Sequence, residues 1–152
     1  MIALDTNVLV YAHRAGAPQH AAARDAIVRA LDNPAGWGIA APTIAEFWSI
    51  VTHPKIPGGP SSPSLVTRFF HYLLTEGGGH IWTPGPGFGE RLMRWAASLK
   101  VRGRKIFDLQ IALVAMEHGA RQVWTHDEQF VALPGIKVID PLQTINRSSR
   151  DS

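Results

Sequence analysis

The feature that most restricts the fold of this chain is the alternation of short apolar segments with longer segments of helical periodicity. The short segments predict strands, and they are residues 2–4, 38–41, 80–84, 122–126 and 136–140. The longer segments predict helices over residues 6–15, 20–33, 42–53, 64–76, 88–100 and 108–119, with a shorter helix over 127–133. Strands that alternate with helices in this way favour an α/β domain with a mainly parallel central sheet.

The length and composition fit one such domain. The chain has 152 residues, of which 45% are hydrophobic, enough for a packed core. We expect residues 1–142 to form a single domain and residues 143–152 to form a polar, flexible C-terminal tail. There is no cysteine, which excludes disulfides and thiolate metal sites. No apolar stretch has the length of a membrane span, so we expect a cytoplasmic protein that does not engage a membrane.

A cluster of basic residues indicates an anionic partner. The net charge is +3 at pH 7, and Lys100, Arg102, Arg104 and Lys105 lie together just before Asp108. A positive cluster of this kind can hold a nucleic-acid backbone. It can equally be a solvated loop, and the sequence leaves both interpretations open.

Four acidic residues occupy one kind of place along the chain. Asp5 ends the first strand, Glu46 lies in the first turns of the helix after the second, Asp108 begins the 108–119 helix, and Asp127 follows the strand 122–126. In a parallel sheet, the carboxyl ends of the strands and the first turns of the following helices meet at one edge, where such folds bind ligands. We therefore expect these four acids to converge.

Each acid also has a structural alternative. Asp5 and Asp108 are both plausible helix N-caps. Glu46 could complement a helix dipole, and Asp127 could stabilise a local turn through its side chain. The convergence of all four favours a site, because four separate caps would not need to share one edge.

A cluster of carboxylates predicts a hard divalent cation, since like charges held together need a counterion. Oxygen ligands without paired histidines favour Mg²⁺ or Mn²⁺ over zinc. Such an ion can activate water and stabilise charge on phosphorus oxygens, the usual chemistry of metal nucleases. Arg102, Arg104 and Lys105 would then hold the backbone of the substrate.

Other functional motifs are absent from the sequence. There is no P-loop, no G-x-G-x-x-G after the first strand, no G-x-S-x-G and no H-E-x-x-H. The aromatic stripe of the 64–76 helix, around Phe69, Phe70 and Tyr72, is read most simply as core, with a partner groove as the alternative.

Taken in order, the segments LDTNVLVYA, the helix with Glu46, FDLQIALVAMEHG and WTHDEQF resemble a PIN domain of the VapC type. The resemblance extends from Met1 to about Leu142. These proteins are the ribonuclease toxins of type II toxin–antitoxin pairs. The resemblance implies a three-layer α/β/α domain, a divalent-metal-dependent endoribonuclease, a homodimer and a cognate antitoxin whose C-terminal segment occupies the active-site groove.

Carried over to this sequence, the resemblance implies that Asp5, Glu46, Asp108 and Asp127 bind Mg²⁺ or Mn²⁺ and take part in catalysis. Asn7 and Thr125 fall where the family has polar groups that orient the carboxylates. Glu128 is an alternative to Asp127 as the fourth acid. The identity of the RNA, and whether one or two ions bind, are left open.

Two other functions stay open at this point. A phosphotransfer or phosphatase domain would use Asp5 as a nucleophile, but Asn7 stands where that chemistry needs a second aspartate. A non-catalytic nucleic-acid-binding module would use the basic residues alone, and its affinity would fall with salt without any benefit from Mg²⁺.

Overall fold

In the computed structural model, the described residues are 1–131 and 133–143. They form a sheet of five parallel strands with the spatial order β3-β2-β1-β4-β5. The strands are β1 (Ile2–Leu4), β2 (Trp37–Ala40), β3 (His80–Trp82), β4 (Gln122–Trp124) and β5 (Lys137–Ile139). The predicted α/β class and parallel sheet are confirmed. Residues 144–152 of the predicted tail lie outside the described residues.

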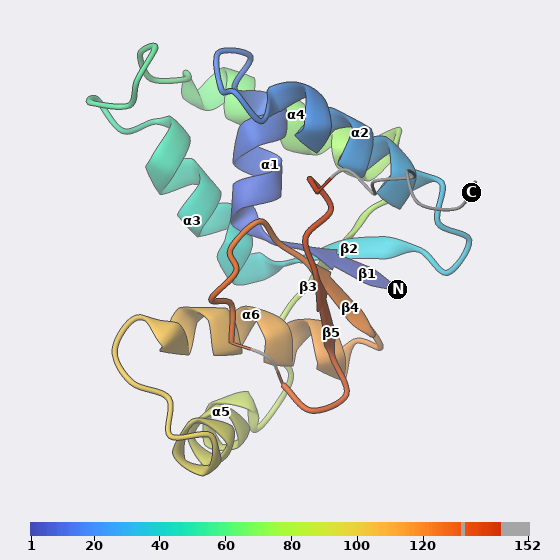
Figure 1. Cartoon of the computed structure of the whole chain (residues 1–152), viewed down its shortest axis with the longest axis vertical. Helices are drawn as coiled ribbons and strands as arrows, with labels where there is room; N and C mark the ends of the chain where they lie inside the picture. The colour runs from blue at the N-terminus through green and yellow to red at the C-terminus, as the bar shows by residue number, and fades with distance from the viewer. Residues whose placement is uncertain (132, 144–152) are drawn as a thin grey trace, which may run out of the picture.

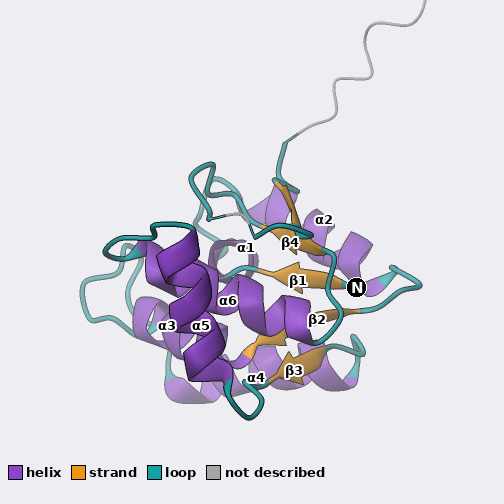
Figure 2. Cartoon of the chain, turned by 90° about the horizontal axis from the view of Figure 1, so that it is seen from below, coloured by secondary structure: helices purple, strands orange, loops and turns teal. Residues whose placement is uncertain are grey.

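Helices cover both faces of the sheet, which confirms the three-layer arrangement (Figure 1). They are α1 (Thr6–His13), α2 (His20–Leu31), α3 (Ala41–Val51), α4 (Pro63–Thr75), α5 (Phe88–Ser98) and α6 (Lys105–Glu117). One core joins the sheet to α1, α2, α3 and α4, and a second core joins it to α5 and α6. In Figure 2, α5 and α6 lie in front of the strands.

Successive side chains of a strand point to opposite faces of the sheet, which explains how so small a sheet contributes to two cores. Ile2 and Leu4 point into the core with α1 and α2, whereas Ala3 points into the core with α6. In β2, position 38 has no room for a side chain, because a Cβ at Gly38 would lie 2.5 Å from the indole ring of Trp82. Glycine there lets Trp82 cross the strand closely, so both faces stay filled.

The strand order changes direction between β1 and β4. From β1 the chain proceeds outward through β2 and β3, and after α5 and α6 it returns to pair β4 with the other side of β1. This is the topological switch point of an open parallel sheet, where the loops after two neighbouring strands diverge and leave room for a ligand. Asp5 follows β1 and Thr125 follows β4, so both lie at that point.

Apart from shifts of one or two residues at their ends, two predicted elements differ from the structure. The helix predicted from Asp108 begins three residues earlier, at Lys105, with Arg104 as its N-cap, so Asp108 lies in the first turn and does not cap. The short helix predicted over residues 127–133 is wrong, since residues 127–131 form a turn and a loop. The Asp127 carboxylate accepts a hydrogen bond from the Gln129 amide (2.9 Å), and this local bond replaces the first helical turn.

No helix in the described part of the chain is long and apolar enough to cross a membrane.

Candidate active site

The site is built around Asp5, the only one of the four acids that is buried, with 7% of its surface exposed. It is the N-cap of α1, and its Oδ1 accepts a hydrogen bond from the Thr6 amide (2.8 Å). The capping alternative for Asp5 is therefore correct, but it uses only one carboxylate oxygen. The other, Oδ2, accepts from the hydroxyl of Thr125 (2.8 Å), which follows the neighbouring strand β4.

Asn7 and Thr125 form a hydrogen-bonded network around that second oxygen. The Asn7 side-chain amide donates to Thr125 Oγ1 (2.9 Å) and lies 3.5 Å from Asp5 Oδ2. The Asn7 carbonyl oxygen accepts from the His126 amide (3.0 Å), and Thr125 Oγ1 accepts from the Asp127 amide (3.1 Å). The two residues expected to orient the acids thus connect Asp5 to the segment that carries Asp127.

The other three acids come from separate elements. Glu46 lies on α3, Asp108 lies in the first turn of α6, and Asp127 lies in the turn after β4. Together with Asp5 they line one cavity of about 300 Å³, whose walls also include Thr6, Asn7 and Tyr11. The predicted convergence of Asp5, Glu46, Asp108 and Asp127 at one edge of the sheet is therefore present.

The electrostatics of the acids follow from this crowding. Burial raises the pKa of Asp5 to about 6, against hydrogen bonds from Thr125 and Thr6, and the charges of Glu46 and Asp108 raise it further. Burial and the charge of Asp108 also raise the pKa of Glu46, although the residue as a whole is exposed. The pKa of Asp108 is raised by burial and by Asp127, with Lys105 opposing the shift.

The donor set suits a hard cation. The carboxylates offer only oxygen, and the cavity wall adds the hydroxyl of the buried Thr6, which acts on Glu46. Among those residues, no three His, Asp or Glu side chains are already arranged to hold one ion. Mg²⁺ commonly uses only one or two carboxylates together with water and substrate phosphate, so the residues fit it.

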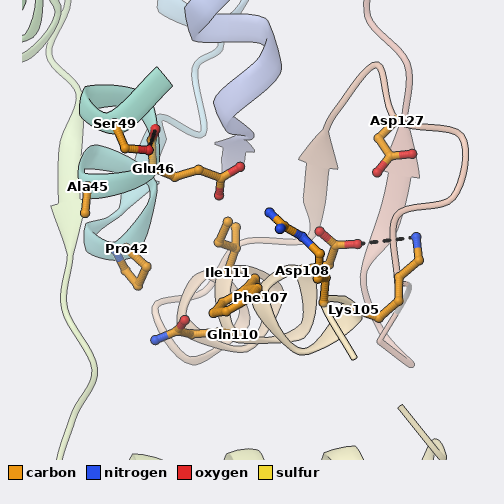
Figure 3. A pocket seen from close by; sticks show the side chains of 11 residues that line it. Pro42, Ala45, Glu46, Ser49, Lys105, Phe107, Asp108, Gln110, Ile111 and Asp127 are labelled. Atoms are coloured by element: carbon orange, nitrogen blue, oxygen red, sulfur yellow. Dashed lines mark hydrogen bonds and ion pairs between the residues drawn. The ribbon is translucent and has the colours of Figure 1, made fainter. Parts of the chain in front are cut away.

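A second, wider cavity of about 690 Å³ adjoins the first and shares Glu46, Asp108 and Asp127 with it. Figure 3 shows the facing side chains of α3 and α6 that form its walls. Lys105 lines it, with its ammonium 3.7 Å from the Asp108 carboxylate and bonded to the Gln129 carbonyl oxygen. Arg104 lines it too, and its charge acts on Glu46.

Not every predicted residue lies in these cavities. Arg102 is exposed in the loop before α6 and lines neither of them, in contrast to Arg104 and Lys105. Glu128 also lines neither, whereas Asp127 lines both, which favours Asp127 as the fourth acid.

Sequence reasoning missed several residues of the site. Gln110 and Ile111 line the wider cavity but were predicted only as part of an apolar helix, and Phe107, which lines it too, was placed before that helix. The signal was available, since Arg104, Phe107, Asp108 and Ile111 follow the i, i+3, i+4, i+7 spacing of one helix face.

Comparison with known proteins identifies the family. The sequence profile of the PIN domain matches residues 2–136. The chain belongs to the PIN-domain family. This PIN domain is 28% identical over 139 residues to Ribonuclease VapC48 of Mycobacterium tuberculosis, covering 90% of this chain and 94% of the relative. It is 29% identical over 120 residues to Ribonuclease VapC43 of the same organism, covering 79% of this chain and 82% of that relative.

Solved structures agree on the PIN fold. M. tuberculosis VapC20, described as a toxin that cleaves the sarcin–ricin loop, aligns with a TM-score of 0.65 and 15% identity over 86% of this chain and 92% of that one. A structure of FitAB bound to the IR36 DNA fragment aligns with a TM-score of 0.66 and 22% identity over 97% of this chain and 99% of that one. At these identities the structural likeness supports the fold alone.

Proposed function

We propose that this PIN domain is a divalent-metal-dependent endoribonuclease and the toxin of a toxin–antitoxin pair. The observation that carries the proposal is the shared cavity of Asp5, Glu46, Asp108 and Asp127 at the switch point of the sheet. Membership of the PIN family and relatives named as ribonucleases support the same chemistry and point to RNA as the substrate.

Asp5 and Asp108 are the proposed principal metal ligands, with Glu46 and Asp127 completing the acidic cavity through water or directly. Mg²⁺ or Mn²⁺ bound there would supply an activated water and offset negative charge on the phosphoryl oxygens. The protein's own contribution is to orient Asp5 through the hydroxyl of Thr125 and the amide of Asn7. Arg104 and Lys105 are placed to bind backbone phosphates beside the acids.

The test is cleavage of a mixed cellular RNA pool by the full chain with Mg²⁺, with Mn²⁺ and with EDTA. Asp108→Asn removes one carboxylate from the cavity, and Asp25→Asn removes an exposed carboxylate of α2 as a matched control. We expect discrete fragments only with metal, from wild type and Asp25→Asn but not from Asp108→Asn. Equal cleavage by Asp108→Asn would show that the site is misplaced.

Two other measurements on the wild-type chain test the two other functions. An aspartate-based phosphotransferase would form a covalent aspartyl-phosphate on Asp5, which hydrolysis by water does not require. A pure binding module would retain RNA without cutting it, and Mg²⁺ would not change its affinity apart from the general effect of salt.

The toxin role and its partners form the biological part of the proposal. We expect induction of the wild-type chain in a bacterial host to arrest growth, Asp108→Asn to be tolerated, and co-expression of the cognate antitoxin to restore growth. The homodimer that the family resemblance implies can be checked by light scattering on the purified chain. Growth arrest by Asp108→Asn would show that toxicity does not depend on the proposed nuclease site.

A further inference from the structure

The wider cavity has a wall that metal binding and phosphate contact do not use. Beyond the acids and the two basic residues, it is lined by apolar groups of α3 and α6, namely Pro42, Ala45, Phe107 and Ile111. Phe107 is the most conspicuous of these, because 54% of its surface is exposed although it belongs to an otherwise well-buried helix. The ring is not an isolated exposed residue, because it stands with Pro42, Ala45 and Ile111 along the wall of one cavity. Apolar groups that line a concave site together are typical of a binding surface.

The spacing of the wall residues shows how the cavity is made. On α3, the lining residues Pro42, Ala45, Glu46 and Ser49 are spaced i, i+3, i+4, i+7. On α6, Arg104, Phe107, Asp108 and Ile111 repeat that spacing from the N-cap. Each helix therefore turns one stripe toward the other, and each stripe carries its acid beside apolar groups. Figure 3 shows the two stripes facing each other across open space.

We propose that this wall is a subsite for one unpaired nucleobase of the RNA strand, which stacks on the ring of Phe107 next to the cleaved phosphate. The inference rests on the proposed ribonuclease function and adds the part of the substrate that the site reads. A flat base needs an apolar face to stack on, and aromatic rings supply it in proteins that bind single-stranded RNA.

Two features make a nucleic-acid strand the fitting occupant. The cavity adjoins the acidic one and shares Glu46, Asp108 and Asp127 with it, so a strand whose phosphate meets the acids has room here for a neighbouring nucleotide. Arg104 and Lys105 at its rim complement the charge of the backbone. The side-chain amide of Gln110 can both donate to and accept from a base edge, and it lines the same wall.

The proposal predicts recognition of unpaired RNA. A base inside a duplex is stacked on both sides and cannot turn onto Phe107 without being unpaired. We expect a single-stranded RNA oligonucleotide to be cleaved with a higher kcat/KM than the same sequence held in a perfect duplex.

The decisive experiment removes the ring and the base in turn. The cleaved bond is first mapped in a single-stranded RNA oligonucleotide, and the flanking nucleotides are then replaced one at a time by abasic ones. Phe107→Leu keeps an apolar side chain without a flat face, and Phe107→Tyr keeps the ring. Tyr72→Leu is the matched control, since Tyr72 is an exposed aromatic of α4 that lines neither cavity.

We expect Phe107→Leu to lower kcat/KM by about 5- to 150-fold, the range measured for losing one stacked base, with Phe107→Tyr and Tyr72→Leu near wild type. An abasic nucleotide at the stacked position should lower the rate of wild type similarly and leave Phe107→Leu no worse, because the two changes remove one contact. Additive losses at every flanking position would overturn the proposal.

Two further measurements test whether a loss of activity in Phe107→Leu comes from weaker metal binding or from a changed oligomeric state. Mn²⁺ binding by Phe107→Leu should equal that of wild type; a wild type that neither binds Mn²⁺ nor cleaves RNA would reject the ribonuclease proposal itself. Light scattering reports the oligomeric state. If Phe107→Leu changes that state along with its activity, the ring belongs to a contact between two copies of the chain, and the subsite is rejected.

Discussion

The two halves of the candidate active site are built in different ways. In the buried half, Asp5 and Thr125 are 7% and 1% exposed, and their polar atoms are hydrogen-bonded to each other and to Asn7. In the open half, Glu46 and Asp127 are exposed, and the partner of Asp108 is the ammonium of Lys105 at 3.7 Å. The comparison teaches that one half holds its geometry through the fold, whereas the other stays accessible to solvent and substrate.

Asp108→Asn should have the largest effect on activity with little effect on folding. It removes a charge from the open half, and we expect cleavage to fall roughly 100-fold or more, as losing several kcal/mol of charge stabilisation implies. Because Asp108 is only half-buried and does not cap its helix, the free energy of unfolding should change by less than about 1 kcal/mol. RNA cleavage and urea unfolding measure the two effects. A large loss of stability would show that Asp108 also supports the fold, which would contradict the distinction between the buried half and the open half.

Asp5→Asn should instead change the stability of the fold as well as the activity. The pKa of Asp5 is raised from 3.8 to about 6 in the folded chain, so its contribution to stability is complete below about pH 4 and is lost as pH rises through 6. Without metal, the neutral asparagine should therefore make the chain more stable at pH 7, by at most roughly 3 kcal/mol. Urea unfolding from pH 4 to 8 in EDTA tests this, and an unchanged pH dependence would contradict it.

Thr125→Val tests the network of the buried half. The hydroxyl donates to Asp5 and accepts from Asn7 and the Asp127 amide, so valine leaves three polar groups without that partner. We expect a loss of about 1–3 kcal/mol in stability and about 10- to 100-fold in Mn²⁺ affinity. Thr125→Ser is the control, since it restores the hydroxyl. Wild-type affinity in Thr125→Val would show that Asp5 holds its orientation alone.

Lys105→Gln should give the smallest effect. The Lys105 side chain is 40% exposed, and exposed ion pairs of this kind contribute about 0.2–1 kcal/mol. We expect KM for RNA to rise about two- to fivefold, with the difference shrinking at high salt because counterions screen the contact. Lys137→Gln on β5 removes an exposed charge elsewhere as the control. An equal effect from both variants would mean that only net charge matters.

The sequence predicted more of the buried half than of the open half. A polar run directly after an apolar strand is a local signal, and it pointed to Asp5, whereas the expectation for Asn7 and Thr125 came from the resemblance to the PIN family. The start of α6 was misplaced because Arg104 caps it without a side-chain hydrogen bond, so no Ser, Thr, Asp or Asn marks the boundary.

The errors around Asp127 and Phe107 have a different cause. The periodicity of residues 127–133 suggested a helix, but the hydrogen bond between Asp127 and the Gln129 amide favours a turn. Phe107 has the identity of a core residue. Its spacing places it on the helix face of Asp108, but the position of α3 determines that this face borders an open cavity and is not covered. The hydrophobic pattern alone does not distinguish a ring that is buried in the core from a ring that lines an open cavity.

The hydrogen bond between Thr125 and Asp5 joins residues 120 positions apart in the chain. At translation rates of about 5–20 residues per second, Asp5 is synthesised about 6–24 s before the residue that orients it. Until β4 has paired with β1, the carboxylate has neither that hydroxyl nor Asp127 beside it. A site assembled in this order is not complete until most of the messenger that encodes the chain has been read.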